Sequence, residues 1–229
     1  MKPLIVANWK CSPVTLKEAK QLFNSVARGI KNIKNVETVI CPPFIYLPIL
    51  GVSAFAKGFG GLRLGSQDCF WENPPTGGGA FTGEISPKML KDLGVKYVII
   101  GHSERRRHLK ETDEMINKKT KAALLLGPKP ILCIENLSQL KAGLRGISEK
   151  VIIAYEPVFA IGTGKPCSIV KAKKMRKSIK YPRVLYGGSV NSQNAKNYIL
   201  EGGFQGLLIG GVSLNSQEFL KMIRDIEKI

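Results

Sequence analysis

The sequence predicts an α/β fold, a single (β/α)8 barrel that comprises residues 1–229 as one domain. Short apolar runs typical of buried strands recur eight times, and each precedes a longer stretch with helical periodicity and helix start signals. Eight strands joined by right-handed crossovers pair in parallel and can close into a barrel without free edges. The alternative is a doubly wound open sheet. No Gly-x-Gly-x-x-Gly motif follows the first run, where such a sheet would hold a dinucleotide.

The predicted strands are nearly continuous in hydrophobicity, as expected for strands that are covered on both faces. In chain order they are residues 4–7, 38–41, 62–65, 97–100, 130–134, 151–155, 184–186 and 206–209.

The predicted helices follow these strands, and Ser86, Thr112 and Ser168 are candidate N-caps. In chain order the helices are residues 15–30, 46–57, 86–93, 112–126, 137–144, 168–179, 193–201 and 216–229. Only about twenty residues separate the starts of strands five and six, whereas a full βαβ unit needs roughly thirty. The helices after strands five and six are therefore predicted to be shortened.

The composition is that of a globular protein with a strong excess of basic residues. The 35 Lys and Arg outnumber the 17 Asp and Glu, which gives a formal net charge of +18, while the hydrophobic fraction of 44% excludes a disordered or collagen-like chain. The basic residues are densest between Lys171 and Lys180 and are not interleaved with aromatic residues. We therefore expect no specific nucleic-acid partner, while weak, salt-sensitive association stays open.

The cysteines indicate a reducing compartment. The five cysteines are an odd number and form neither a Cys-x-x-Cys pair nor a zinc-binding pattern, so they predict no metal site. The N-terminal apolar run ends at Ala7, too early for a signal peptide, and no long apolar stretch follows. We expect a cytoplasmic protein with no membrane partner.

The residues that follow the strands are the candidate catalytic groups, because barrels place their chemistry at the carboxyl ends of the strands. Glu156 follows the sixth strand and suits a general base, although it could simply pair with a lysine. His102 follows the fourth strand and suits an electrophile or proton shuttle, although a lone histidine is more often structural. Asn8 and Lys10 follow the first strand, where Lys10 could supply positive potential or simply be exposed.

Two glycine pairs and one apolar segment complete the candidate site. Gly187-Gly188 and Gly210-Gly211 follow strands seven and eight, where bare backbone could bind a phosphate group, although either pair could be a plain tight turn. Residues 157–165 have an apolar centre between a proline and glycines, which predicts a lid rather than an ordinary polar loop.

Five motifs, in order along the whole chain, resemble the triosephosphate isomerase family, whose fold is the TIM barrel. The motifs are residues 7–10, 79–84, 101–106, 154–165 and 186–190. The resemblance implies that Glu156 moves a proton between two carbons through an enediol. It also implies that neutral His102 polarises the carbonyl group, that Asn8 and Lys10 stabilise the enediolate, and that Glu104 supports Lys10.

The resemblance also implies a small phosphorylated triose as substrate, without a cofactor. The phosphate group would bind to backbone N–H groups at Gly162, Ser189, Gly210 and Gly211. Pro157 and Ile161 would belong to the lid, which Tyr186 and Ser189 would hold shut. An isomerase of another phosphosugar on the same barrel is the closest alternative.

A homodimer is implied as well, in which the third loop, residues 67–84, enters the partner subunit. Thr82, Glu84 and Arg105 would lie at this interface, and Glu111 would support it. The sequence departs from the family's usual residues at Asp68, at Phe159 and at Leu109-Lys110, and its third loop is a few residues longer than usual.

Overall fold

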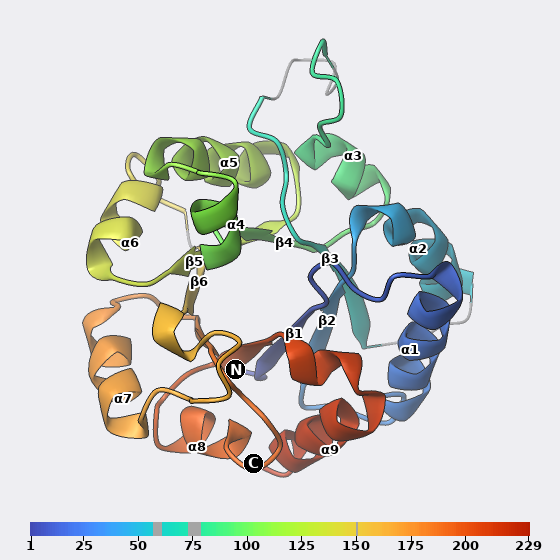
Figure 1. Cartoon of the computed structure of the whole chain (residues 1–229), viewed down its shortest axis with the longest axis vertical. Coiled ribbons are helices and arrows are strands. Elements are labelled where there is room, and N and C mark those ends of the chain that lie inside the picture. Colours follow the sequence, from blue (N-terminus) through green and yellow to red (C-terminus); the bar gives the residue numbers. More distant parts are fainter. Residues whose placement is uncertain (57–60, 73–78, 150) are drawn as a thin grey trace.

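A computed structural model of the chain describes residues 1–56, 61–72, 79–149 and 151–229. Eight parallel strands close into one barrel in sequence order, and helices surround it (Figure 1). The strands are β1 (Leu4–Asn8), β2 (Glu37–Cys41), β3 (Leu62–Ser66), β4 (Tyr97–Ile100), β5 (Lys129–Ile134), β6 (Ile152–Tyr155), β7 (Val184–Gly187) and β8 (Gly206–Ile209). The predicted (β/α)8 TIM barrel is confirmed, and all eight predicted strands are present.

The strand residues divide into two packed sets, because successive side chains in a strand point to opposite faces. Leu4 and Val6 belong to a cluster that contains only strand residues and fills the interior of the barrel. Ile5 and Ala7, on the other face of β1, belong to the larger core, which also contains Phe23 from a surrounding helix. This packing on both faces explains why the strands are continuously apolar.

The helices follow the predicted order. They are α1 (Leu16–Gly29), α2 (Leu47–Ala56), α3 (Pro87–Asp92), α4 (Ser103–His108), α5 (Asp113–Leu126), α6 (Leu137–Gly143), α7 (Ile169–Ser178), α8 (Ala195–Leu200) and α9 (Ser216–Glu227). Short 3-10 helices lie at Phe44–Tyr46, Val158–Ala160 and Gly211–Leu214. Lys57, predicted at the end of the second helix, lies outside the described residues.

Three helix starts are confirmed by their hydrogen bonds. The side chains of Ser86, Thr112 and Ser168 each accept a hydrogen bond from a backbone N–H group in the first turn of α3, α5 and α7. These bonds satisfy donors that the helix itself leaves unpaired.

The lengths of the helices differ in part from the expectation. The helix after β5, α6, has 7 residues and the helix after β6, α7, has 10, compared with 14 in α1 and α5. Helices α3, α4 and α8 are shorter still, with 6 residues each, and the sequence did not predict that α3 and α8 would be so short. Helix α4 was also not predicted, because its six polar residues carry no apolar periodicity.

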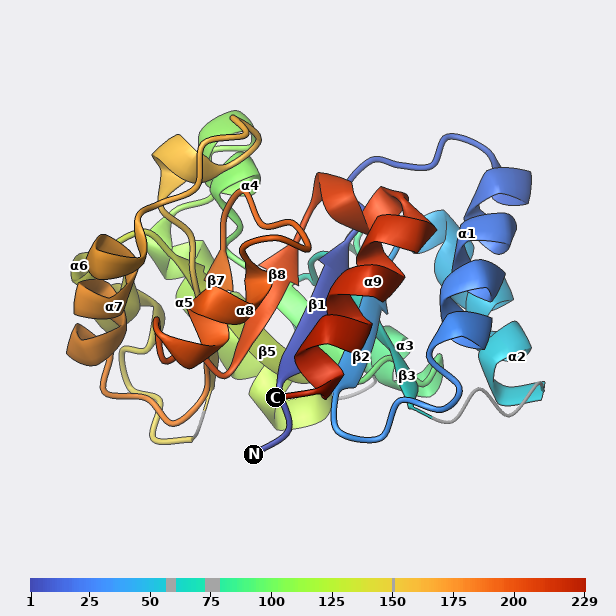
Figure 2. The ribbon, with the colours of Figure 1, turned by 90° about the horizontal axis from the view of Figure 1, so that it is seen from below.

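The two ends of the barrel differ in what they carry. Figure 2 shows α4 and the segment that follows β6 at one end of the barrel, and the N-terminus at the other. Since all strands are parallel, every strand exit lies at the end that carries α4.

Candidate active site

The strand exits surround one cavity of about 300 Å³ at this end of the barrel. The four predicted catalytic residues and the four predicted phosphate-binding residues all line it: Asn8, Lys10, His102, Glu156, Gly162, Ser189, Gly210 and Gly211. The structure thus brings together side chains and backbone from five of the eight strand exits.

Glu156 and His102 face each other in this cavity, and both are about 95% buried. Atom Nε2 of His102 lies 3.3 Å from Oε1 of Glu156. The second carboxylate oxygen, Oε2, lies 3.5 Å from the backbone N–H of Ser103, which donates to it. A carboxylate and an imidazole are therefore held within reach of one small ligand.

Helix α4 determines which nitrogen of His102 carries the proton. His102 is the N-cap of α4, and its Nδ1 accepts a hydrogen bond from the backbone N–H of Glu104 at 3.2 Å. A nitrogen that accepts cannot carry a hydrogen, so in the neutral ring the hydrogen is assigned to Nε2. Nε2 is the nitrogen that faces Glu156, and the imidazole therefore presents a donor to the cavity.

Lys10 is held at the cavity by its backbone as well as by its side chain. Its φ of 54° lies in the left-handed region, which costs a residue with a side chain about 1–3 kcal/mol. Asn8 Oδ1 accepts from the Lys10 N–H at 3.0 Å, and Gln67 Nε2 donates to the Lys10 carbonyl oxygen at 2.8 Å. The Lys10 ammonium forms an ion pair with Glu104.

Gln67 is a further site residue, and it was not predicted from the sequence. Gln67 directly follows β3, and its amide also donates to the Cys41 carbonyl oxygen at the end of β2, at 2.9 Å. Its position directly after a strand was the feature of the sequence that could have indicated a site residue. However, its partners are backbone oxygens, which no residue pattern reveals.

The glycines leave part of the cavity wall open to a ligand. Gly211 has no atom within 4 Å of the place where a Cβ would stand, and at Gly210 the nearest atom is Lys10 Cε at 3.4 Å. Gly162 has a φ of 70°. Without side chains here, backbone N–H groups can approach an anion closely.

The predicted lid and the segment after it are tied to the barrel at two points. Ser189 Oγ donates to the Ala160 carbonyl oxygen at 2.7 Å, and Tyr186 Oη accepts from the Cys167 N–H at 3.0 Å. Between Pro157 and Cys167, Phe159 is 61% exposed while Ala160 is fully buried. Ser189 thus contacts the predicted lid itself, residues 157–165, whereas Tyr186 contacts the segment that directly follows it.

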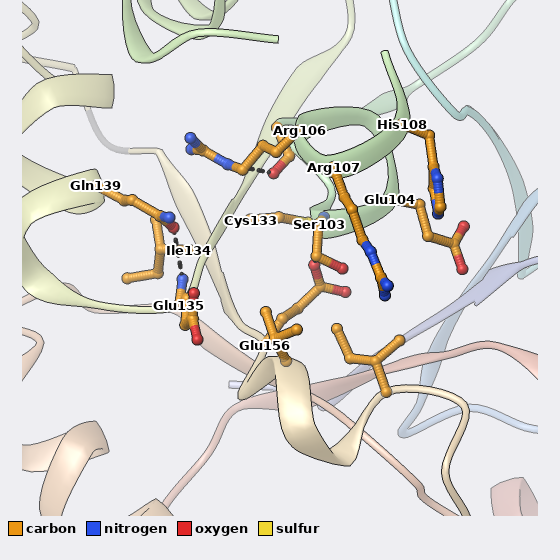
Figure 3. A pocket seen from close by; sticks show the side chains of 13 residues that line it. Ser103, Glu104, Arg106, Arg107, His108, Cys133, Ile134, Glu135, Gln139 and Glu156 are labelled. Atoms are coloured by element: carbon orange, nitrogen blue, oxygen red, sulfur yellow. Dashed lines mark hydrogen bonds between the residues drawn. The ribbon is translucent and has the colours of Figure 1, made fainter. Parts of the chain in front are cut away.

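A second cavity of about 440 Å³ adjoins the first, and Glu156 and Ile161 line both. Figure 3 shows it with Glu156 among the lining side chains. On its walls the Glu135 N–H donates to Gln139 Oε1 at 2.8 Å, and Arg106 Nε donates to the Gly101 carbonyl oxygen at 2.9 Å. Glu156 therefore separates two spaces at the barrel end.

A buried cluster of four charges lies behind the site. Lys119 Nζ lies 2.6 Å from Asp68 Oδ2 and 2.5 Å from Glu111 Oε1, and Arg105 contacts the same two oxygens at 2.8 and 2.6 Å. Burial is the largest influence on Asp68 and raises its pKa to about 6, despite the two cations. Because Gln67 precedes Asp68, the cluster anchors the segment that holds Lys10.

The residues predicted at a dimer interface differ in their exposure to solvent. Arg105 is half-buried within this charge cluster, while Thr82 and Glu84 are exposed. Residues 73–78 of the third loop lie outside the described residues.

Among the described residues, no group of three or more His, Cys, Asp or Glu side chains could hold a metal ion, and no helix has the length and hydropathy to span a membrane. Cys11 is exposed, and the other four cysteines are buried and free.

The fold and the site together define a barrel enzyme with a carboxylate, an imidazole and an ammonium group facing a glycine-walled cavity. The family model described as "Triosephosphate isomerase" matches residues 3–226. The chain therefore belongs to the triosephosphate isomerase family, and it is an isomerase.

Similar proteins named triosephosphate isomerase occur in several bacteria. That of Caldanaerobacter subterraneus subsp. tengcongensis is 42% identical, covering 97% of this chain and 98% of the relative. That of Lactobacillus delbrueckii subsp. bulgaricus is 40% identical (96% and 97% covered), and that of Aquifex aeolicus is 39% identical (97% and 99% covered). The first alignment spans 253 positions against 229 residues in this chain, so that relative contains segments that this chain lacks.

Proposed function

We propose that this protein interconverts dihydroxyacetone phosphate and D-glyceraldehyde 3-phosphate without a cofactor, as a step of glycolysis and gluconeogenesis. The observation that carries the proposal is the 3.3 Å separation between Glu156 and the protonated nitrogen of His102 in the glycine-walled cavity. Family membership and the names of the relatives support the substrate.

Glu156 is the base of the proposed reaction. Its carboxylate removes a proton from the carbon next to the carbonyl group, and the electron pair of that C–H bond forms the carbon–carbon double bond of an enediolate. The hydroxyl proton moves from one oxygen of the enediolate to the other by way of Nε2 of His102. The carboxylic acid then returns its proton to the neighbouring carbon, and the carbonyl group re-forms on the other carbon. No atom is gained or lost, so the reaction needs no redox partner.

His102, Asn8 and Lys10 stabilise the negative charge that develops on oxygen. The Nε2–H of His102 donates to the carbonyl oxygen, which lowers the energy of the enediolate. The Lys10 ammonium adds positive potential, and its ion pair with Glu104 supports its position. Asn8 supports the same position through the hydrogen bond that it accepts from the Lys10 backbone.

The phosphate group binds at the glycine-lined part of the wall, on the backbone N–H groups of Gly162, Ser189, Gly210 and Gly211. The lid, residues 157–165, which includes Pro157 and Ile161, covers the substrate and excludes water. Closure, supported by Tyr186 and Ser189, also protects the enediolate from losing its phosphate group.

We further propose that the protein is a cytoplasmic homodimer, in which Thr82, Glu84 and Arg105 contact the partner subunit. The exposure of Thr82 and Glu84 supports this arrangement, and the free cysteines support a reducing compartment. Light scattering measures the mass directly. A mass of twice 25.1 kDa is expected, and a monomer mass would contradict the dimer.

A coupled assay tests the proposed reaction. The purified protein is given D-glyceraldehyde 3-phosphate, and the dihydroxyacetone phosphate formed is reduced by an added dehydrogenase that consumes NADH. We expect rapid turnover of the triose phosphates and none of pentose phosphates. Turnover of pentose phosphates alone would favour the alternative phosphosugar isomerase.

A further inference from the structure

The net charge is concentrated in one sector of the barrel. Residues 157–200 contain nine Lys and Arg residues and no Asp or Glu, so this stretch carries half of the net charge of +18. Helix α7, with its ten residues, contains five of these basic residues. In contrast, α1, α5 and α9 each contain both acidic and basic residues.

The lysines of α7 lie on its outer side. Helical geometry places Lys173, Lys174 and Lys177 on one face together with Val170, opposite the fully buried Ala172. All three lysines are exposed, and Val170 is 79% exposed. Lys171 and Lys180, which are also exposed, flank this face. We refer to these five lysines as the α7 basic face.

The arginine of this helix has a structural role that the lysines do not share. The Arg176 guanidinium donates to the carbonyl oxygens of Gly203 and Ile179 and to Gln205 Oε1, at 2.8 to 3.0 Å. These bonds join the end of α7 to the start of β8. Within the described parts of the chain, the ion pairs use other basic residues, and the lysines of the α7 basic face have none.

Among these lysines the helix dipole favours Lys177, which lies in the last turn, but it does not account for the others. Lys171 lies in the first turn, where the helix dipole disfavours a positive charge. Lys173 and Lys177 are four residues apart, and Lys174 and Lys177 are three apart, so like charges repel along the exposed face. A polyanion bound across the face would remove this repulsion.

The chemistry of the face favours the backbone of a nucleic-acid duplex. Large apolar side chains that could enter a membrane are limited on the described surface of α7 to Val170. The helix contains no aromatic residue on which the bases of a single strand could stack. The α7 basic face therefore presents mainly ammonium groups. These can pair with the regular row of phosphates in a duplex backbone, and they do not read the sequence of bases.

We propose that the α7 basic face is a sequence-independent binding surface for the phosphodiester backbone of duplex nucleic acid. No residue of α7 lines the cavity that contains Glu156, so the surface is separate from the proposed isomerase site. Its binding is therefore measurable whether or not the proposed reaction is correct.

Fluorescence anisotropy of a labelled 24-base-pair DNA, titrated with the full-length protein at several KCl concentrations, tests this proposal. If five lysines each neutralise a phosphate, the plot of log K against log salt has a slope of about −4.5, which lowers affinity about 500-fold between 50 and 200 mM. The variant Lys173→Gln/Lys174→Gln/Lys177→Gln should reduce the slope by about 2.7 and keep isomerase activity.

A control variant distinguishes the α7 basic face from the overall charge. Lys20→Gln/Lys31→Gln/Lys34→Gln removes the same charge at exposed positions on α1 and the loop after it, across the barrel from α7 (Figure 1). It should retain the slope of the unmodified protein. An equal loss in both variants, or no binding to DNA at 50 mM KCl, would overturn the proposal.

Two further ligands test the chosen partner. The same strand without its complement should bind more weakly than the duplex, because α7 offers its bases no aromatic side chain to stack on. Vesicles of phosphatidylserine and phosphatidylcholine should also bind more weakly. Tighter α7-dependent binding to either ligand would overturn the assignment to a duplex.

Discussion

Atom Nε2 of His102 lies 3.3 Å from Oε1 of Glu156, and the other nitrogen of the ring, Nδ1, accepts a hydrogen bond from the Glu104 N–H. The hydrogen bond keeps a hydrogen on the nitrogen that faces Glu156. A group that accepts a proton from carbon and a group that donates to oxygen are thereby placed side by side, which the proposed isomerisation requires.

Replacing the base tests this relationship first. We expect Glu156→Gln to lower kcat roughly 10²- to 10⁴-fold, because the amide has nearly the same shape but cannot accept the proton. The coupled assay measures the loss, and circular dichroism checks the fold. The matched control is Glu149→Gln, an exposed position just before β6, which should keep full activity. Full turnover by the Glu156 variant would contradict the proposed mechanism.

Lys10 should matter for the reaction and little for stability. Lys10→Met removes the ammonium group near the developing charge, and we expect kcat/KM to fall roughly 10²- to 10³-fold. The ion pair with Glu104 is part-exposed, so the melting temperature should change little. Lys88→Met breaks the exposed ion pair with Asp92 and serves as the control. Unchanged kcat/KM in the Lys10 variant would show that the ammonium group has no catalytic role.

The lid contacts predict a change in reaction outcome as well as in rate. Tyr186→Phe keeps the ring stacked on Tyr198 but leaves the buried Cys167 N–H without its acceptor, a loss of about 1–3 kcal/mol. If this loss of free energy destabilises only the closed form of the lid, kcat/KM should drop roughly 5- to 150-fold. More inorganic phosphate should be released per turnover, because an open lid exposes the enediolate.

A second tyrosine variant separates lid closure from general destabilisation. Tyr97→Phe removes a hydrogen bond to Glu37 at the opposite end of the barrel. It should leave the ratio of phosphate release to isomerisation unchanged. The same increase in both variants would refute a specific role for Tyr186 in holding the lid.

The buried charge cluster predicts an unusual pH dependence of stability. Because burial raises the pKa of Asp68 from 3.8 to about 6, the folded protein holds this proton more tightly than the unfolded chain does. The contribution of Asp68 is therefore most favourable below about pH 4 and is lost as the pH rises through about 6, by up to about 3 kcal/mol.

The variant Asp68→Asn should remove this dependence, because the amide does not titrate. Unfolding free energies of both proteins are measured in urea between pH 4 and 7, at one protein concentration. The unmodified protein should lose stability relative to the variant as the pH rises. A constant difference between the two proteins across this range would disprove the prediction.

Most of the barrel could be predicted from the sequence. Each strand is an apolar run bounded by turn residues, and Ser86, Thr112 and Ser168 mark helix starts through local hydrogen bonds. Helix α4 could not be predicted in this way, since Ser103–His108 has no buried residue and therefore no apolar pattern.

The sequence by itself determined the closed barrel, the positions of Glu156, His102 and Lys10 at strand exits, and the glycines of the cavity wall, because these features depend on local residue patterns. Only the tertiary structure decided how they are connected. The proton position on His102 depends on α4, the backbone of Lys10 depends on Gln67, and the pKa of Asp68 depends on burial beside Lys119. The last two properties arise from contacts between distant segments, which the order of residues does not display. The first arises from a local cap on a helix that has no apolar pattern.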